Sequence, residues 1–179
     1  NALAGLAKQG VTDWICVMAG DDQGRGEYRD QLLTTAERLG IGDRVRIPGH
    51  VADVPAALAA TTIAVAPSVE PEAFGRAAVE AQAARVPIIV SDHGAVRETV
   101  LAPPEVARDK RTGWRVPPGD GEALTAALFE ALQASRETRY AIGSRGRAHA
   151  LANFSLAAMK RKTLGVYHSV LEDDASALY

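Results

Sequence analysis

The sequence predicts an α/β domain built on a Rossmann-like, doubly wound parallel sheet with helices on both faces. Short β-branched runs alternate with longer helical segments, and short connections join them, so consecutive strands are expected to run parallel. Hydrophobic residues make up 47% of the chain but aromatic residues only 5%, which predicts an aliphatic core. A length of 179 residues suits one domain, and we treat residues 1–179 as a single unit.

The first elements follow from hydrophobic periodicity. Residues 1–10 have the pattern of the second half of an amphipathic helix, and no cap or initiator Met precedes them, so we expect the chain to begin inside a larger protein. Residues 14–19 form a continuous apolar run, which predicts a strand buried on both faces. Residues 27–39 carry one apolar helical stripe. Residues 44–48 alternate as a short strand.

The middle of the chain continues this alternation. Asp53 can cap a short helix over residues 54–60, because its carboxylate can accept hydrogen bonds from the free amides of a first turn. The runs at 62–66 and 87–90 are rich in β-branched and apolar residues and predict strands. Residues 74–85 lie between them and are strongly helical in composition.

The last part of the chain is mostly helical. Asp120 precedes the predicted helix at 122–133 and can cap it in the same way as Asp53 caps its helix. The remaining predicted elements are a short helix at 94–100, a strand at 114–116 and helices at 122–133, 137–152 and 156–171.

Charge and cysteine content exclude several classes of protein. The chain has 20 basic and 22 acidic residues, a net charge of −2, so we expect no nucleic-acid partner. A single cysteine, Cys16, excludes an internal disulfide and a cysteine-based metal cluster. No apolar run approaches the roughly 20 residues that span a bilayer. These features together predict a cytoplasmic domain.

The segment from residue 67 to 81 carries the most chemical information. In a doubly wound sheet, ligands bind at the carboxyl ends of the strands, and this segment follows one of them. Its helix is expected to begin near Phe74 and Gly75, which leaves the amides of Phe74, Gly75 and Arg76 free at the positive end of the helix dipole. Gly75 also allows a ligand to approach the main chain. We therefore predict a phosphate site here.

Two carboxylates flank this helix start, Glu72 before the first turn and Glu80 about two turns later. A carboxylate can accept two hydrogen bonds from a vicinal diol. A ligand with a diphosphate at the helix start, a ribose diol on one glutamate and a hexose hydroxyl on the other would be a nucleotide-sugar. The alternative is that Glu72 is an ordinary acidic residue near a helix N-terminus and that Glu80 is a solvated helix position. Glu80 lies among alanines and a valine at 77–81, where an unpaired surface carboxylate is not expected.

The run from Glu72 to Glu80, EAFGRAAVE, resembles the Glu-x7-Glu motif of the retaining glycosyltransferases of family 4. Flanking motifs occur in the same order, namely GDD at 20–22, DRVRIPG at 43–49, APS at 66–68, SDHG at 91–94 and VPPGD at 116–120. The resemblance implies the carboxyl-terminal, donor-binding half of a GT-B fold. It also implies that residues 153–179 form a helix crossing towards an acceptor domain absent from this chain.

The resemblance assigns roles to individual residues. Glu72 would hold a hydroxyl of the donor sugar and is the catalytic candidate, while Glu80 would hold the nucleotide ribose. The loop at Gly49–Val51 would lie against the base. The donor-binding residues expected in this way are Gly49, His50, Val51, Ser68, Glu72, Phe74, Gly75, Arg76 and Glu80. This chain has Arg85 where the family usually has glycine.

The function implied is retaining transfer of a hexose from a nucleotide-diphosphate sugar to a glycan or lipid-linked acceptor, in bacterial polysaccharide or lipopolysaccharide biosynthesis. No metal or other cofactor is expected, because protein cations offset the charge of the leaving diphosphate. In the family these cations lie upstream of residue 1, so the chain alone is expected to be inactive. A nucleotide-sugar epimerase of the same architecture and a non-catalytic nucleotide-binding module remain alternatives.

Two basic features have more than one interpretation. Lys160, Arg161 and Lys162 on the last helix can meet anionic lipid headgroups, which would place the protein at the inner face of the membrane, or they can form a solvated helix face. His50 and His93 each follow a strand, and each is either a ligand contact or an ordinary loop histidine.

Overall fold

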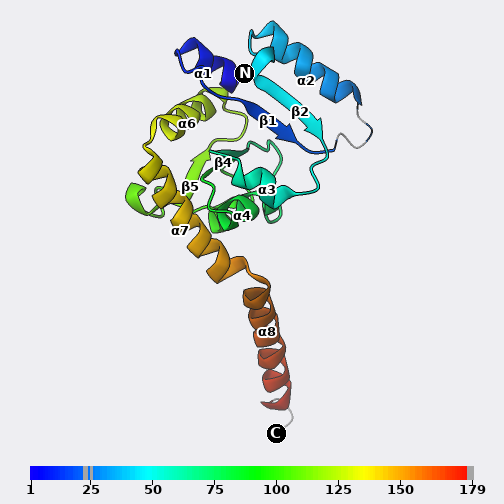
Figure 1. Ribbon diagram of the computed structural model, residues 1–179. Coiled ribbons are helices and arrows are strands. Elements are labelled where there is room, and N and C mark those ends of the chain that lie inside the picture. Colours follow the sequence, from blue (N-terminus) through cyan, green and yellow to red (C-terminus); the bar gives the residue numbers. More distant parts are fainter. Residues whose placement is uncertain (22–23, 25, 177–179) are drawn as a thin grey trace.

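The computed structural model describes residues 1–21, 24 and 26–176 (Figure 1), and it confirms the alternation of strands and helices. The strands are β1 (Cys16–Ala19), β2 (Val45–Gly49), β3 (Ala64–Ala66), β4 (Ile88–Ser91) and β5 (Gly113–Val116). The helices are α1 (Ala2–Lys8), α2 (Gly26–Arg38), α3 (Val54–Ala59), α4 (Arg76–Ala83), α5 (Val96–Thr99), α6 (Gly121–Gln133), α7 (Arg136–Phe154) and α8 (Leu156–Ser176). Short 3-10 turns lie at Gly42–Arg44 and Arg108–Lys110.

Both predicted caps are present. The carboxylate of Asp53 accepts from the amide of Ala56 at 2.9 Å, at the start of α3. The carboxylate of Asp120 accepts from the amides of Glu122 and Ala123 at 3.0 and 2.9 Å, at the start of α6. These bonds satisfy first-turn donors and therefore fix where each helix begins.

The strands form two parallel sheets rather than one. β1 pairs with β2, and β3, β4 and β5 form a second sheet in that order. β4 is the central strand of the larger sheet, and all its residues are buried. Its side chains alternate between two separate cores: Ile89 faces one, and Ile88 and Val90 face the other.

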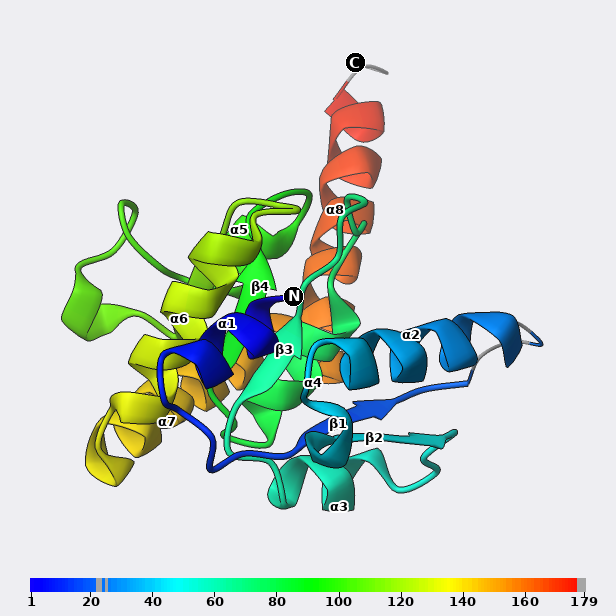
Figure 2. The same ribbon diagram turned by 90° about the horizontal axis from the view of Figure 1, so that it is seen from above.

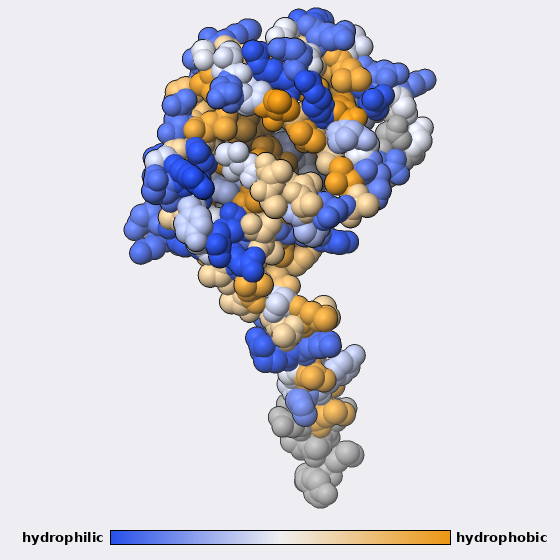
Figure 3. Space-filling model, in the orientation of Figure 1, coloured by the Kyte–Doolittle hydropathy of each residue, from blue (hydrophilic) through white to orange (hydrophobic). Residues whose placement is uncertain are grey.

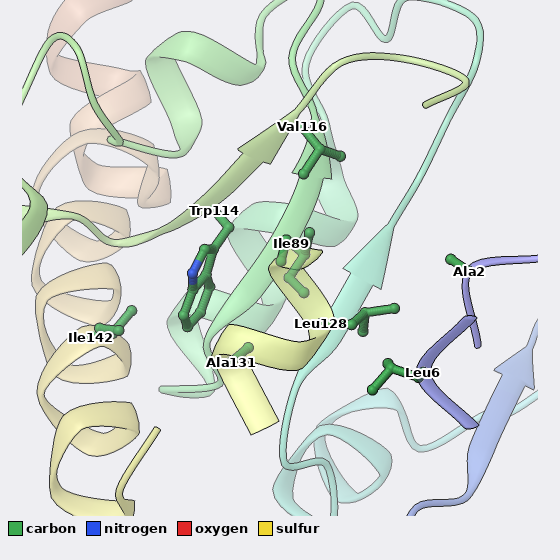
Figure 4. Close-up of a cluster of buried hydrophobic side chains, with 9 residues drawn as sticks. Ala2, Leu6, Ile89, Trp114, Val116, Leu128, Ala131 and Ile142 are labelled. Atoms are coloured by element: carbon green, nitrogen blue, oxygen red, sulfur yellow. The ribbon is translucent and has the colours of Figure 1, made fainter. Parts of the chain in front are cut away.

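The first core lies between the larger sheet and α1, α6 and α7 (Figure 4). Ile89 and Trp114 from the sheet meet Leu128 of α6 and Ile142 of α7, and Leu6 of α1 closes the cluster. Each of these side chains is at most 6% exposed. Burying large aliphatic and aromatic side chains of this kind contributes about 1.5–3 kcal/mol apiece, so this cluster is a main source of stability.

The second core covers the opposite face of the same sheet (Figure 2). Ala78 and Ala81 of α4 and Val96 of α5 pack on Ile88 and Val90. The larger sheet therefore has helices on both faces, as the sequence predicts.

α1 joins the two sheets. Its Ala2 and Leu6 belong to the first core, while its Ala4 packs with Ala36 of α2 and Val45 of β2. One short helix therefore contributes to the packing of both sheets.

The prediction that residues 14–19 are buried on both faces is wrong. Val17 is 59% exposed and Met18 37% exposed, and Ile15 just before the strand is 65% exposed. Within the described residues, β1 pairs on one edge only, and so does β3, whose Val65 is 41% exposed. Figure 3 shows a hollow beside β1, between the two sheets, with hydrophobic residues around it. Ile15, Val17 and Met18 are therefore not covered by a packed layer of the described residues.

The two longest helices behave differently. α7 packs along α4, where the carbonyl of Arg85 lies so close that a Cβ on Gly143 would sit 2.1 Å from its oxygen. Arg85 itself has a φ of +65°, so it occupies the left-handed conformation that glycine adopts more readily. α8 extends away from the rest of the chain (Figure 1) and is exposed along most of the part whose side chains are described. None of the described helices is both long enough and apolar enough to cross a bilayer.

Candidate functional site

The carboxyl ends of β3, β4 and β5 lie at one edge of the larger sheet because the three strands are parallel. Their last residues are in register, with Ala66 opposite Val90 and Ser91 opposite Val116. The loops at 67–75, 92–95 and 117–120 therefore begin side by side. This edge is where ligands bind in doubly wound sheets.

The start of α4 has an unusual conformation. The helix begins at Arg76, not at Phe74 as predicted, because Gly75 adopts φ 74° and ψ 55° and cannot be part of a right-handed helix. Gly75 is the N-cap residue, and no side chain caps the first turn. The amides of Arg76 and Ala77 therefore remain available to a ligand, at the end of the helix where the dipole favours an anion, whereas the amide of Ala78 bonds the Gly75 carbonyl at 3.0 Å.

Glu72 lies against this turn. Its side chain is half-buried, and its Oε1 accepts a hydrogen bond from the hydroxyl of Ser68. Its Oε2 lies 3.8 Å from the position that a Cβ on Gly75 would take. The carboxylate is thus held close to the uncapped helix start, and the structure brings three of the predicted residues, Ser68, Glu72 and Gly75, together.

The neighbouring loop at 92–95 holds the main chain of this segment. The carbonyl of Glu72 accepts from the amide of Ala95 at 3.2 Å. A Cβ on Gly94 would lie 2.5 Å from the same carbonyl oxygen, and Gly94 has a φ of +61°. Only glycine allows this close approach without displacing Glu72.

His93 adds a second bond between the two loops. Its Nε2 lies 2.8 Å from the carbonyl oxygen of Ser68. The sequence left open whether His93 contacts a ligand or is an ordinary loop histidine, and it did not predict a contact with Ser68. The available signal is the parallel order of β3 and β4, which puts the residues that follow each strand next to each other.

The loop after β4 is in turn held by ionic contacts. Arg97 donates from Nε to Asp92 at 3.0 Å, and Arg115, whose side chain is 3% exposed, lies 3.7 Å from the same carboxylate. Arg115 also donates to Glu105, and this hydrogen bond holds the pKa of the Glu105 carboxyl below its usual range. The site is therefore backed by a network that crosses from β4 to β5.

Glu80 differs from its expected surroundings. Its side chain is 43% exposed, and Oε1 accepts from Nη2 of Arg76 at 3.1 Å, one helical turn away. Glu80 is not an unpaired surface carboxylate, but its partner is Arg76 and not a buried group: α4 buries Ala78 and Ala81 against β4, while Glu80 lies half-exposed beside the exposed Ala77. The Arg76 side chain, 83% exposed, pairs with Glu80 in this state.

The other predicted residues lie further from Glu72 in the fold or contact different partners. The ring of Phe74 packs edge-on against Phe154 at the end of α7, with 5.6 Å between centroids. Gly49 ends β2 in the smaller sheet with a φ of +82°; His50 after it is exposed and Val51 half-buried. Of the GDD motif, Asp22 lies outside the described residues.

A surface hollow of about 430 Å³ lies between α1 and the start of α6, next to the loop at 117–120. It is lined by Asn1, Lys8 and Asp120 among others, and not by Glu72. We place the site at Glu72 rather than at this hollow, because the uncapped helix start and the held carboxylate supply specific polar groups there.

Comparison with known proteins identifies the family of the chain. The family model described as "Glycosyl transferases group 1" matches residues 1–149. The lipopolysaccharide core biosynthesis mannosyltransferase LpcC of Rhizobium leguminosarum bv. viciae is 32% identical over 166 residues, which is 92% of this chain and 45% of LpcC. The chain thus spans about half the length of this relative.

Solved structures show the same fold. A glycosyltransferase from Rickettsia africae superposes with a TM-score of 0.82 at 27% identity, covering 95% of this chain and 42% of that one. Anabaena HepE, solved in complex with UDP-glucose, gives 0.79 at 24% identity, covering 94% of this chain and 44% of HepE. Both matches place the chain as half of a larger GT-B architecture. The chain therefore belongs to the group 1 glycosyl transferases.

Proposed function

We propose that this chain is the donor-binding half of a retaining glycosyltransferase that uses a nucleotide-diphosphate sugar. The observation that carries the proposal is the helix start at Gly75, where uncapped amides lie beside the held carboxylate of Glu72. Amides at a helix N-terminus bind phosphate, and a carboxylate next to them binds hydroxyls. A sugar linked to a diphosphate presents both kinds of group.

The proposed donor class has support from the shared fold. HepE is solved in complex with UDP-glucose, so a GT-B fold of this kind accommodates a nucleotide sugar. LpcC is named as a mannosyltransferase of lipopolysaccharide core biosynthesis. On this basis we propose hexose transfer to a glycan or lipid-linked acceptor in envelope polysaccharide synthesis. Transfer is favoured over epimerisation and over a non-catalytic role because the family's named members are transferases.

The mechanism that follows is electrostatic and positional. The amides of Phe74, Gly75 and Arg76 would stabilise charge that develops on the leaving diphosphate, and Glu72 would fix the sugar by its hydroxyls. Glu80 would bind the ribose diol, which requires it to exchange its bond to Arg76 for bonds to the ligand. No step of this proposal uses a metal ion.

Replacing Glu80 with alanine tests the ribose assignment. In the full-length enzyme, Glu80→Ala is expected to weaken binding of UDP-glucose or GDP-mannose at least tenfold, about 1.4 kcal/mol, because the diol loses its acceptor. Isothermal titration calorimetry gives the dissociation constants. Glu37→Ala, which removes an exposed glutamate from α2, is the matched control and should leave them unchanged. Equal affinities for Glu80→Ala and the control would contradict the assignment.

We also propose that α8 contacts an anionic membrane surface. Its exposed apolar side chains include Leu164, Tyr167 and Leu171, and Lys160 to Lys162 add three consecutive cations. A basic residue near an anionic lipid surface contributes about 1 kcal/mol.

Changing Lys160, Arg161 and Lys162 together to glutamine is therefore expected to reduce binding to phosphatidylglycerol-containing vesicles at least tenfold in a sedimentation assay. Arg136→Gln, an exposed cation at the start of α7, serves as the control and should not change the bound fraction. Vesicle binding that survives the triple substitution would contradict the contact.

A further inference from the structure

We propose that His93 is a positioning residue that sets the Glu72 carboxylate through Ser68. The inference rests on the proposed function of Glu72 as the sugar-binding carboxylate. Its structural basis is a continuous chain of hydrogen bonds from the loop after β4 to the loop after β3. His93 bonds the carbonyl of Ser68 at 2.8 Å, and the hydroxyl of the same serine bonds Oε1 of Glu72.

The direction of the first bond is fixed by chemistry. A carbonyl oxygen only accepts, so Nε2 of His93 must carry the proton and donate it to Ser68. Nδ1, the other ring nitrogen, is shielded from solvent and bonds no described residue. Both nitrogens are therefore turned away from a ligand, which makes direct contact between His93 and the donor the weaker interpretation.

Ser68 needs this support because of where it lies. It follows Pro67, which has no amide proton to donate, and the next residues, Val69 and Glu70, are exposed. A serine hydroxyl rotates freely, so it aims at Glu72 only if its own backbone is fixed. His93 fixes the Ser68 end of the loop, while the bond from Ala95 to the Glu72 carbonyl fixes the other end.

Ser68 has a defined effect on Glu72 in this arrangement. Its bond occupies Oε1 and leaves Oε2 facing the turn at Gly75. Without His93 the serine loses its orientation, and the carboxylate is free to take other rotamers. A polar group that is already ordered in the free protein binds a ligand more tightly than a mobile one, because binding then loses no further side-chain entropy.

The experiment compares the sugar nucleotide with its bare nucleotide in the full-length enzyme. Calorimetry gives affinities for UDP-glucose against UDP, and for GDP-mannose against GDP. For the better-bound pair, we expect His93→Ala to weaken binding of the sugar nucleotide about tenfold and to leave that of the diphosphate within twofold. A purely structural role for His93 would weaken both ligands alike, and that result would overturn the inference.

Two conservative variants distinguish the role of Nε2 from that of Nδ1. Glutamine places its amide nitrogen where Nε2 of histidine lies, whereas asparagine places it near Nδ1. His93→Gln should therefore restore sugar-nucleotide affinity, and His93→Asn should not. Equal affinities in these two variants, with both folded by circular dichroism, would overturn the inference even if His93→Ala fails to fold.

A double-substitution cycle tests whether His93 acts through Glu72. Glu72→Gln combined with His93→Ala should bind the sugar nucleotide no more weakly than Glu72→Gln alone, because the two residues belong to one chain of contacts. Additive losses would show a separate role for His93 and overturn the inference. If Glu72→Gln leaves binding unchanged, or if the wild-type enzyme binds neither sugar nucleotide, the proposed function itself fails.

Discussion

A full-length enzyme carrying Glu72→Gln is expected to turn over its donor about 100-fold more slowly than the wild type. Hydrogen bonds to a charged group contribute about 1.5–3 kcal/mol, and the amide retains the shape of the carboxylate without its charge. The loss therefore corresponds to about 2.7 kcal/mol of transition-state stabilisation. The measurement is the initial rate of nucleoside diphosphate release from UDP-glucose or GDP-mannose.

The matched control for this experiment lies two residues away. Glu70 is in the same loop but exposed, so Glu70→Gln changes the same charge without touching the helix start. It is expected to retain the wild-type rate. A rate for Glu72→Gln that matches that of Glu70→Gln would remove the central support for the proposed site.

The largest expected effect on stability comes from Gly143→Ala. The added methyl would lie 2.1 Å from the carbonyl oxygen and 2.9 Å from the carbonyl carbon of Arg85. This backbone cannot easily move, because the Arg85 amide bonds Gln82 at 2.8 Å and the next residue, Val86, is buried. α7 must therefore separate from α4, and we expect a loss of about 3 kcal/mol in the free energy of unfolding, measured in urea.

Gly165→Ala provides the comparison within another helix. A Cβ at Gly165 of α8 meets nothing within 4 Å. Alanine favours a helix over glycine by about 1 kcal/mol, so this variant should be neutral or slightly more stable. If both variants lose stability equally, the effect at Gly143 does not come from the α4–α7 contact.

Features that depend on neighbours in sequence were predictable. The caps at Asp53 and Asp120 were predicted from residue type and position, because a capping carboxylate reaches amides only two or three residues away. The glycine that precedes α4 was also identified, although the exact helix start was not. Its left-handed conformation, which moves the start to Arg76, is a property of two dihedral angles that composition does not specify.

Features that depend on distant segments were not predictable. An apolar run predicts burial, but Val17 is exposed because the strands divide into two sheets, which is decided by pairing and not by composition. Glu80 was expected in apolar surroundings because its neighbours in sequence are apolar, yet helix geometry turns Ala78 and Ala81 into the core and leaves Glu80 half-exposed. His93 reaches Ser68 across 25 residues, and only the strand order brings them together.

The attachment of the smaller sheet through α1 has a consequence for ligand selection. The family resemblance implies that the base lies against the loop at Gly49–Val51, and we propose that the sugar lies against Glu72, so the two ends of one donor would contact different sheets. Leu6 of α1 packs in the core of the larger sheet, and Ala4 packs in the core of the smaller sheet. The position of α1 would therefore set the distance between the base end and the sugar end of the donor site. Discrimination between donors of different length would then depend on the distance between the two sheets, and the packing of α1 between them would set that distance.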